Sequence, residues 1–316
     1  MTEPGELLGR VAATGLLPPG ARVLVLLSGG RDSTCLLDMA VQLGCRARAL
    51  HVDYGLRAES AQDADHCRAL CARLEVELDV QEAGRPDDAP GNLQAWARDV
   101  RYAAAARAAG GGLVAAGHTA TDQAETVLYR LATSPGRRAL LGMRARSGQL
   151  VRPLLSLTRA QTAQWCLSRG LAWREDATNA SDRFARGRVR ERLVPALEAV
   201  DPRAVESILR TAELLREEAE VLDVVVETAL AGRDRIVVAQ LAALPRALGR
   251  LVVRRLAEDA TSASCPRAAT RLDDLLALGD GALDVGEGAR GVVAGGVLRF
   301  EPTPPLGAGS RRAADA

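Results

Sequence analysis

The segment RVLVLLSGGRDSTCLL, residues 22–37, constrains the fold of this chain more than any other. It begins with an apolar run, Arg22–Leu27, which predicts a buried strand, and from Ser33 it continues with a pattern typical of a helix. Two glycines join the two parts, and glycine accepts the tight, left-handed turns that such a junction needs. A buried strand that leads directly into a helix is typical of α/β proteins.

The same alternation continues along the first half of the chain. We expect further strands at 47–52, 76–81 and 113–116, helices at 58–74, 93–109 and 120–131, and a loop at 85–92. Strands that alternate with helices predict a parallel sheet with helices on both faces. Ligands of such sheets bind at the carboxyl ends of the strands, where this chain has Ser28–Gly30, His51–Asp53 and Gly117–His118.

Strand patterns become rare after Pro153. From Pro202 to Leu278 apolar residues recur at spacings of three and four, which indicates helices. Residues 285–300 are glycine-rich with short β-like pieces, and the tail from Pro302 has a composition typical of disorder. We therefore expect an α/β domain at 1–200, a smaller helical domain at 201–283, and a β-like segment with a disordered tail at 284–316.

Composition excludes several kinds of site. All 41 basic residues are arginines, so there is no lysine for a Schiff base or a Walker-type phosphate loop. The six cysteines form no Cys-x-x-Cys pair and there are only three histidines, which argues against a structural zinc site. No signal-peptide pattern follows Met1, and no apolar run reaches the roughly 18 residues of a membrane span. We expect a cytoplasmic protein with mostly buried cysteines.

Positive charge is concentrated in one region, although the net charge of the chain is only +1. Residues 130–192 contain 14 arginines and four acidic residues. Such an excess favours a surface that faces a polyanion such as a nucleic acid. The alternative is a set of solvated arginines spread over several helices.

The glycine turn, residues 28–33, predicts a site for a phosphate-like anion. Backbone N–H groups at a helix start attract anions, and the hydroxyls of Ser28 and Ser33 add donors. Asp32 repels an anion and needs a separate explanation. It either caps the helix or faces a magnesium ion that the phosphates carry.

The pattern Ser-Gly-Gly-x-Asp-Ser after a strand resembles the pyrophosphate loop, or PP-loop, of the N-type ATP pyrophosphatases. The resemblance implies that a substrate is adenylated with loss of pyrophosphate. It also implies that ATP is held by the turn, with Mg²⁺ at Asp32; the ATP-binding residues would be Ser28, Gly29, Gly30, Arg31, Asp32 and Ser33.

Further motifs resemble one branch of that superfamily, the tRNA(Ile)-lysidine synthetases. They are HVDYGLR at 51–57, AWARDVRY at 95–102, the block at 117–143, RPLL at 152–155, Trp173-x-x-Asp176-x-x-Asn179 and RFARGRVR at 183–190. The resemblance covers roughly residues 20–200 and implies an enzyme that uses ATP and L-lysine to modify the wobble cytidine of the isoleucine tRNA with a CAU anticodon. The cytosine carbonyl is adenylated, and the lysine amine displaces AMP to give lysidine. Codon recognition changes from AUG to AUA, and charging from Met to Ile.

His118, Asp122 and Glu125 are candidate catalytic residues beside Asp32. Asp122 and Glu125 are three apart on the expected helix and therefore share a face. They are suited to hold the lysine ammonium, bind magnesium or accept a proton, and the sequence does not divide these roles among the three residues. The structural alternatives are a hydrogen bond at a strand end for His118 and capping of the helix start for the two acids.

Five arginines are candidate tRNA-binding residues: Arg98, Arg101, Arg186, Arg188 and Arg190. Basic side chains position nucleic acids through phosphate contacts, although a solvated polar face explains the same pattern. The resemblance also implies that the domain at 201–283 binds tRNA. His51 and Asp53, at the end of the second strand, are expected either to approach the adenosine of ATP or to have a purely structural role.

Three features depart from the family pattern. Tyr54 stands where the family usually has His, Gly187 replaces an expected Asn, and the segment after Leu283 is short for the extra β domain of longer members. The oligomeric state stays open, with a homodimer as one option.

The alternative function is that of another PP-loop tRNA-modifying enzyme, such as a tRNA thiolase. A thiolase is expected to need paired cysteines, and the close pair Cys67 and Cys71 has the spacing of two core residues on a helix. GMP and NAD synthetases share the first motif without the later ones. A non-catalytic ATP-sensing module would retain the glycine turn and lose the acids, which this chain retains.

Overall fold

The computed structural model describes residues 2–55, 60–84, 93–134, 136–174 and 185–304. The chain divides into two compact units, Met1–Leu215 and Arg216–Ala316, whereas the sequence places a domain boundary after residue 200. The expected loop at 85–92, the motif positions Asp176 and Asn179 and the expected disordered end of the tail lie outside the described residues.

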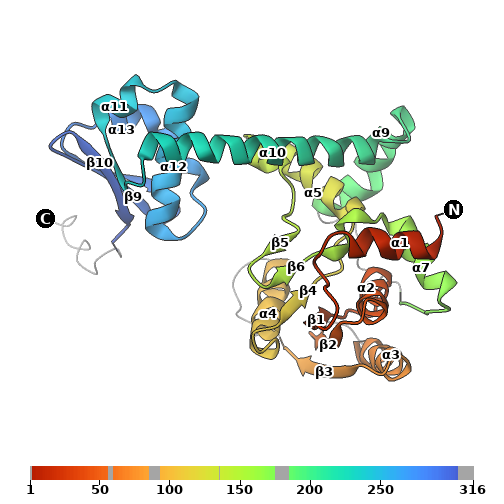
Figure 1. The fold of residues 1–316 in the computed structure, drawn as a ribbon. Coiled ribbons are helices and arrows are strands. Elements are labelled where there is room, and N and C mark those ends of the chain that lie inside the picture. Colours follow the sequence, from red (N-terminus) through yellow and green to blue (C-terminus); the bar gives the residue numbers. More distant parts are fainter. Residues whose placement is uncertain (1, 56–59, 85–92, 135, 175–184, 305–316) are drawn as a thin grey trace, which may run out of the picture. The chain divides into compact units, whose positions relative to one another are not determined.

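A six-stranded sheet forms the centre of the first unit (Figure 1). Its order is β3-β2-β1-β4-β6-β5, and all neighbouring pairs are parallel except β5 and β6. This confirms the α/β fold expected from the sequence. The strands are β1 (Arg22–Leu26), β2 (Arg46–Asp53), β3 (Glu77–Glu82), β4 (Leu113–Ala115), β5 (Arg146–Ser147) and β6 (Leu150–Val151).

Helices cover both faces of this sheet because β1 is apolar on both sides. Val23 and Val25 pack in one buried cluster with Leu36 of α2, while Leu24 and Leu26 pack in another with residues of α4. The helices are α1 (Pro4–Ala12), α2 (Arg31–Gln42), α3 (Ser60–Arg73), α4 (Leu93–Ala108), α5 (Ala120–Thr133), α6 (Arg137–Leu140), α7 (Arg159–Ser168), α8 (Ala185–Arg188) and α9 (Val194–Val200), with a 3-10 turn at Pro153–Ser156, a π turn at Val189–Leu193 and the start of α10 (Ala204–Leu230).

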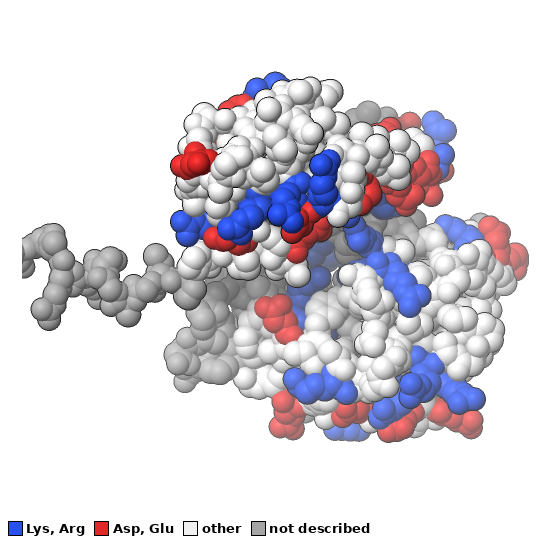
Figure 2. Space-filling view, turned by 60° about the vertical axis from the view of Figure 1, so that its left-hand side comes forward, with Lys and Arg blue, Asp and Glu red and all other residues white. Residues whose placement is uncertain are grey.

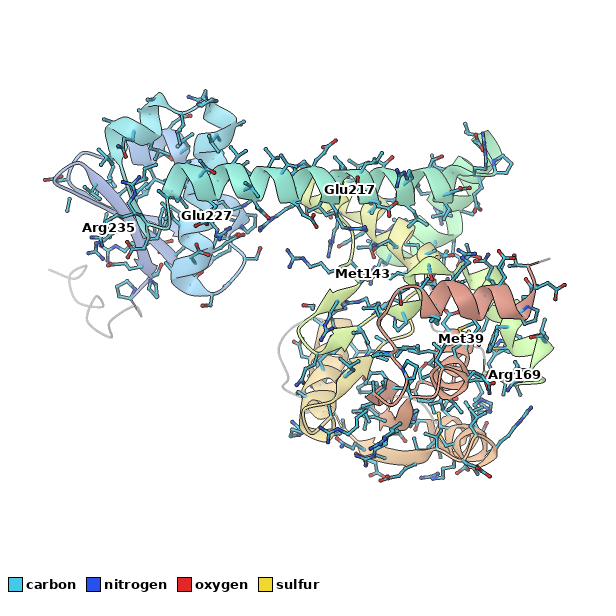
Figure 3. All side chains as sticks on the ribbon, viewed as in Figure 1. Met39, Met143, Arg169, Glu217, Glu227 and Arg235 are labelled. Carbon is cyan, nitrogen blue, oxygen red and sulfur yellow. The ribbon has the colours of Figure 1, made fainter. Side chains whose placement is uncertain are left out.

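A buried polar contact joins α2 to α7. Asp38 of α2 is fully buried and accepts hydrogen bonds from Trp165 Nε1 at 2.8 Å and Arg169 Nε at 3.1 Å. Figure 3 labels Arg169 and the fully buried Met39, which follows Asp38 on α2. A buried carboxylate is tolerated when it is paired and hydrogen-bonded. The contact holds the C-terminal end of α7 against the helix that follows the glycine turn.

The second unit combines helices with a four-stranded antiparallel sheet of order β7-β10-β9-β8. Its elements are β7 (Arg235–Val237), α11 (Val238–Ala243), α12 (Arg246–Thr261), a 3-10 turn at Pro266–Arg271, α13 (Leu272–Ala277), β8 (Gly281–Gly286), β9 (Ala289–Ala294) and β10 (Val297–Pro302). Val253 of α12 and Leu298 of β10 belong to one buried cluster. The expected helices and β-like pieces are present and share a single core. None of the described helices in either unit is long and apolar enough to cross a membrane.

Candidate active site

The glycine turn folds back onto its own serines. Gly29 has a φ of +80°, a conformation that glycine adopts without strain. Ser33 Oγ lies 3.1 Å from Ser28 Oγ, accepts the N–H of Ser28 at 3.2 Å and donates to Gly30 O at 2.9 Å. Helix α2 begins at Arg31 without a side-chain cap from Gly30. Since the first N–H groups of a helix have no partner within it, this turn is suited to bind an anion.

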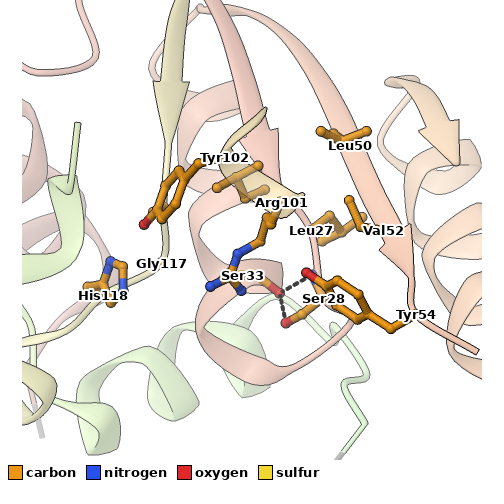
Figure 4. A pocket seen from close by; sticks show the side chains of 12 residues that line it. Leu27, Ser28, Ser33, Leu50, Val52, Tyr54, Arg101, Tyr102, Gly117 and His118 are labelled. Carbon is orange, nitrogen blue, oxygen red and sulfur yellow. Dashed lines mark hydrogen bonds between the residues drawn. The ribbon is translucent and has the colours of Figure 1, made fainter. Parts of the chain in front are cut away.

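A pocket lies beside the glycine turn (Figure 4). Figure 4 shows Arg101 of α4 reaching toward Ser33 and Ser28, with His118 on the other side of the view. An apolar wall with a few polar groups is typical of small-molecule sites, and this one is at the strand ends, as the sequence predicts. The lining residues are Leu26, Leu27, Ser28, Ser33, Leu50, Val52, Tyr54, Arg101, Tyr102, Ala116, Gly117 and His118.

Three buried polar atoms of this pocket have no hydrogen-bond partner among the described residues: Arg101 Nε, Tyr102 Oη and His118 Nδ1. Such atoms are normally paired, so they indicate a place for a ligand. Burial lowers the pKa of His118 to about 4; Asp122 opposes this, while Arg152 and other arginines add to it. The imidazole is therefore neutral at neutral pH and keeps one ring nitrogen as an acceptor.

Strand β2 presents a different set of side chains to the pocket from the pair expected from the sequence. Leu50, Val52 and Tyr54 line it, whereas His51 and Asp53, which alternate with them, are not among the lining residues. Successive side chains of a strand point to opposite faces. The alternation of β2, continued to the next residue, was the pattern that could have identified Tyr54, one of the positions at which the chain departs from the family pattern.

His51 and Asp53 make local contacts instead. His51 is buried, and its Nδ1 lies 2.9 Å from Leu27 O. Asp53 Oδ1 accepts the N–H of Gly55 at 2.8 Å. These contacts support the structural role that the sequence gives as the alternative for both residues.

Three acidic side chains surround one guanidinium at the starts of α2, α5 and α7. Arg159 Nη2 lies 3.0 Å from Asp122 Oδ1, Nη1 lies 3.4 Å from Glu125 Oε1, and Nε lies 3.7 Å from Asp32 Oδ2. We call Asp32, Asp122 and Glu125 the acidic cluster. The sequence reasoning missed Arg159, and its place in the arginine-rich region was the only feature that pointed to it.

Two further arginines complete the pairing of the acidic cluster. Arg190 donates to both carboxylate oxygens of Glu125, from Nε at 2.8 Å and Nη2 at 3.0 Å, and also lies 3.8 Å from Asp122. Arg31 Nε lies 3.0 Å from Asp32 Oδ1. Since Glu125 is only 2% exposed, the two-pronged contact with Arg190 stabilises a carboxylate that water does not reach.

The acids also have local structural partners. Asp122 Oδ2 accepts the N–H of Thr119 at 2.8 Å, and Thr119 Oγ1 accepts the N–H of Asp122 at 3.3 Å, so the two residues cap α5. Burial raises the pKa of Asp122, but Arg159 and Thr119 outweigh it and the net pKa is lowered. Asp32 does not cap α2, and instead accepts a hydrogen bond from Thr162 of α7.

The five candidate tRNA-binding arginines have different surroundings. Arg190 is turned onto Glu125, and Arg186 donates to Thr126 Oγ1 of α5. Arg188 is exposed on α8. These three lie on helical turns and therefore point in different directions, although they alternate in the sequence.

Arg98 and Arg101 lie at the pocket side of the unit. The Cζ atoms of Arg98 and Arg101 lie 5.0 and 5.7 Å from the ring centre of Tyr102. Burial, together with nearby Arg186 and Arg98, lowers the pKa of Arg130, which shows that cations gather here. On the face drawn in Figure 2, basic side chains also lie next to acidic ones.

The comparison with protein families matches residues 10–197 to the PP-loop domain. A tRNA(Ile)-lysidine synthase from Solibacter usitatus is 41% identical over 250 residues, which are 75% of this chain and 56% of that protein. Another from Thermobifida fusca is 38% identical over 280 residues, which are 83% of each chain. The chain belongs to the tRNA(Ile)-lysidine synthase family.

As a member of the tRNA(Ile)-lysidine synthase family, the chain is an ATP-using ligase of tRNA modification that forms a C–N bond. This confirms the enzyme class that the sequence predicts. Among solved structures, the U34-tRNA thiolase NcsA from Methanococcus maripaludis with its [4Fe-4S] cluster has a TM-score of 0.58 at 18% identity, over 67% of this chain and 79% of that one. That likeness shows the fold alone, so the thiolase alternative is less supported than membership of the lysidine synthase family.

Proposed function

We propose that the enzyme ligates L-lysine to the wobble cytidine of the isoleucine tRNA with a CAU anticodon. First, the carbonyl oxygen at ring position two of the cytosine attacks the α-phosphorus of ATP, and pyrophosphate leaves with the bridging oxygen. Next, the side-chain nitrogen of lysine attacks the same ring carbon. AMP leaves with the electron pair of the C–O bond, and one proton leaves the nitrogen.

One observation carries this proposal: the pocket joins the glycine turn to the acidic cluster. Ser33 belongs to both the turn and the pocket, and His118 lines the pocket close enough to Asp122 for the two charges to interact. The end of β4 touches the start of α2, since a Cβ on Gly117 would lie 3.0 Å from Asp32 O. A transfer from ATP to a base and then to an amine needs these sites side by side.

The residues of the turn and the pocket have different chemical roles in this proposal. Ser28, Ser33 and the first N–H groups of α2 hold phosphate oxygens and stabilise the charge of the leaving pyrophosphate. The apolar pocket wall, with Val52 and Tyr54, faces the adenosine. Arg101 Nε and His118 Nδ1 supply a donor and an acceptor to the reacting groups.

The fit of Asp32 to a magnesium ion can be tested on its contacts. Its two carboxylate oxygens face Arg31, Arg159 and Thr162. The described residues also contain no group of three His, Cys, Asp or Glu side chains placed to hold a metal. These contacts do not fit a directly bound Mg²⁺ at Asp32. Magnesium enters the proposal only as the ion that ATP carries on its phosphates.

Recognition of the tRNA is assigned to Arg98, Arg101, Arg186, Arg188 and Arg190 in the first unit. Arg98, Arg186 and Arg188 are exposed there. We also propose that the second unit binds tRNA, that the protein forms a homodimer, and that it is located in the cytoplasm.

The test is incorporation of radiolabelled lysine into two transcripts, the CAU isoleucine tRNA and the elongator methionine tRNA, with ATP and magnesium. Label in the isoleucine transcript alone is the expected result. Label in neither, while ATP still binds, would reject lysine as the amine and require tests of sulfur and ammonia donors.

A pair of variants on α4 links the pocket to this activity. Arg101→Gln is expected to lower incorporation about tenfold or more, because a buried charged donor is lost. Arg107→Gln removes the same charge from an exposed position of the same helix and is expected to leave incorporation unchanged. Equal activity of the two variants would remove Arg101 from the reaction.

A further inference from the structure

The acidic cluster is electrically balanced. Its three carboxylates pair with the guanidiniums of Arg31, Arg159 and Arg190, each contact between 2.8 and 3.8 Å for its closest atoms. Asp122 and Glu125, the acids expected to meet the lysine amine, therefore already have cationic partners in the folded protein.

Arg159 has a special place in this balance. Each of its three nitrogens faces a different carboxylate of the acidic cluster, and these come from two helices, α2 and α5. Its side chain is 26% exposed, whereas that of Glu125 is 2% exposed. Arg159 thus lies on the more open side of the pair, where an incoming amine would approach the acids.

This balance matters for the chemistry of an amine. A lysine side chain has an ordinary pKa near 10.4, so it enters as an ammonium ion, which has no electron pair to donate. Carboxylates without partners would favour the ammonium and keep it unreactive. Carboxylates matched by arginines give no such preference, while their oxygens still accept hydrogen bonds.

We propose that Arg159 keeps the acidic cluster balanced so that the lysine amine binds there in its neutral, nucleophilic form. This inference rests on the proposed function. Arg159 is a positioning and charge-balancing residue, since it acts on the nucleophile through Asp122 and Glu125. The acids then give the site its specificity for an amine, and the arginine keeps that amine reactive.

The charged and titratable groups that face this site come from each element packed around it. They are Arg31 and Asp32 of α2, Arg98 and Arg101 of α4, His118 just before α5, Asp122 and Glu125 of α5, Arg152 before the 3-10 turn, Arg159 of α7, and Arg190 and Glu191 of the π turn. His118 is neutral above about pH 4. Burial opposes the charge of Arg190, but Glu125 and Asp122 outweigh it and raise the pKa of Arg190. Neither residue changes charge between pH 6 and 10.

The experiment measures the amine-transfer step alone. The CAU isoleucine tRNA is adenylated on the enzyme first, and lysine is then added in a single turnover at each pH from 6 to 10. The rate at saturating lysine rises with pH until the bound amine is neutral, so the midpoint reports the pKa of that amine. The protein is the full chain, as wild type, Arg159→Gln, Arg159→Lys and Arg190→Gln.

Arg159→Gln leaves one unmatched negative charge in the acidic cluster. We expect its midpoint to move up by about one pH unit or more. The rate at pH 7 then falls about tenfold or more, recovers at high pH, and the KM for lysine at pH 7 falls. Arg159→Lys keeps the charge and is expected to retain the wild-type midpoint. Arg190→Gln, which removes a charge from the same cluster, should shift the midpoint in the same direction as Arg159→Gln.

Two outcomes would overturn the inference. A rate that falls by the same factor at every pH in Arg159→Gln would show that Arg159 only supports the fold of the site. A KM for lysine that rises would show that the guanidinium binds the carboxylate of the amino acid instead.

Formation of the adenylate separates this inference from the proposed function. Pyrophosphate release with the CAU isoleucine tRNA needs no lysine, so wild type and Arg159→Gln can be compared at that step first. Failure of wild type to release pyrophosphate, or to incorporate lysine, rejects the proposed function. A normal wild-type reaction with an unmoved midpoint in Arg159→Gln rejects the charge-balance inference alone.

Discussion

The pocket and the acidic cluster lie next to each other in the first unit. They differ in whether their buried polar groups already have partners. In the pocket, Arg101 Nε and His118 Nδ1 are buried without a hydrogen-bond partner among the described residues. In the acidic cluster, the most buried carboxylate, that of Glu125, is in contact with two arginines. The pocket is therefore suited to bind a ligand that forms hydrogen bonds with these two atoms.

The two regions show how one fold can separate ligand binding from stabilisation of the folded protein. Unpartnered polar atoms cost stability in the empty protein and recover it when a ligand binds. Paired charges give their stability to the folded protein itself, and an incoming cation must compete for them. Changes in the cluster should therefore lower the stability of the fold, and changes in the pocket should lower ligand binding. Single substitutions in each region test this division.

Glu125→Ala is expected to have the largest effect on stability. It leaves Arg190 and Arg159 partly buried without their shared carboxylate, and removal of one partner of a buried pair lowers the free energy of unfolding by about 3–5 kcal/mol. Urea unfolding of the full chain measures the change. The double variant Glu125→Ala/Arg190→Ala should regain part of the loss, and a single-variant loss below about 1 kcal/mol would contradict a tightly paired cluster.

Gly117→Ala tests the contact between the end of β4 and the start of α2, which lies between the two regions. Its Cβ would lie 3.0 Å from the carbonyl carbon and oxygen of Asp32 and 3.1 Å from Ser33 N, so β4 and the start of α2 must separate. Overpacking of this kind lowers the free energy of unfolding by about 1–3 kcal/mol, and we expect weaker ATP binding as well. Calorimetric titration with ATP checks the second effect.

The control for Gly117→Ala is Gly9→Ala in α1, where a Cβ has no neighbour within 4 Å. This variant should leave ATP binding unchanged and stabilise the helix by about 0.5–1 kcal/mol. Similar losses of ATP affinity in both variants would show that the contact of Gly117 with α2 does not shape the pocket.

His118→Gln should change the pH dependence of stability. The folded protein holds the pKa of His118 at about 4, below its ordinary value of 6.5, so only the unfolded chain takes up a proton as the pH falls between these values. The wild type therefore loses stability from pH 7 to pH 5, by up to about 2 kcal/mol from this residue. Urea unfolding at both pH values should show a smaller loss in the variant, and equal losses would mean that His118 is not desolvated.

Arg48→Gln provides the reference for an exposed charge pair. Arg48 lies 2.8 Å from Glu77, and the two side chains are 47% and 69% exposed. Exposed pairs contribute about 0–1 kcal/mol, so the variant should unfold at nearly the wild-type urea concentration. A loss as large as that of Glu125→Ala would show that burial does not distinguish the acidic cluster from surface pairs.

The sequence was sufficient for the parts of the site that follow from local rules. The apolar run before Ser28, the two glycines and the helical pattern from Ser33 specify a strand, a turn and a helix within a few residues. The structure has them in that order, with the helix beginning at Arg31. Asp122 and Glu125 were expected on one face of a helix, and both contact Arg159. Spacing along one helix is enough for such a prediction.

Contacts between distant segments were beyond the sequence. Arg159 meets Asp32 across more than a hundred residues, and no spacing rule connects the start of α7 with the start of α2. The arginines at 186 and 190 alternate in the sequence, and the structure shows that both also contact α5, which their spacing does not predict. Charge counts identify a basic region without showing which of its arginines have acidic partners.

The hydrogen bond between Trp165 and Asp38 makes Trp165 a fluorescence reporter for this part of the enzyme. The chain has only three tryptophans. Trp165 is 3% exposed and lies on α7, six residues after Arg159, the residue with which that helix begins. Indole emission depends on nearby charge and on access of water, so a shift of α7 against α2 would alter the colour and intensity of the emitted light. The enzyme thus carries its own fluorophore on the helix whose first residue, Arg159, pairs with the acidic cluster.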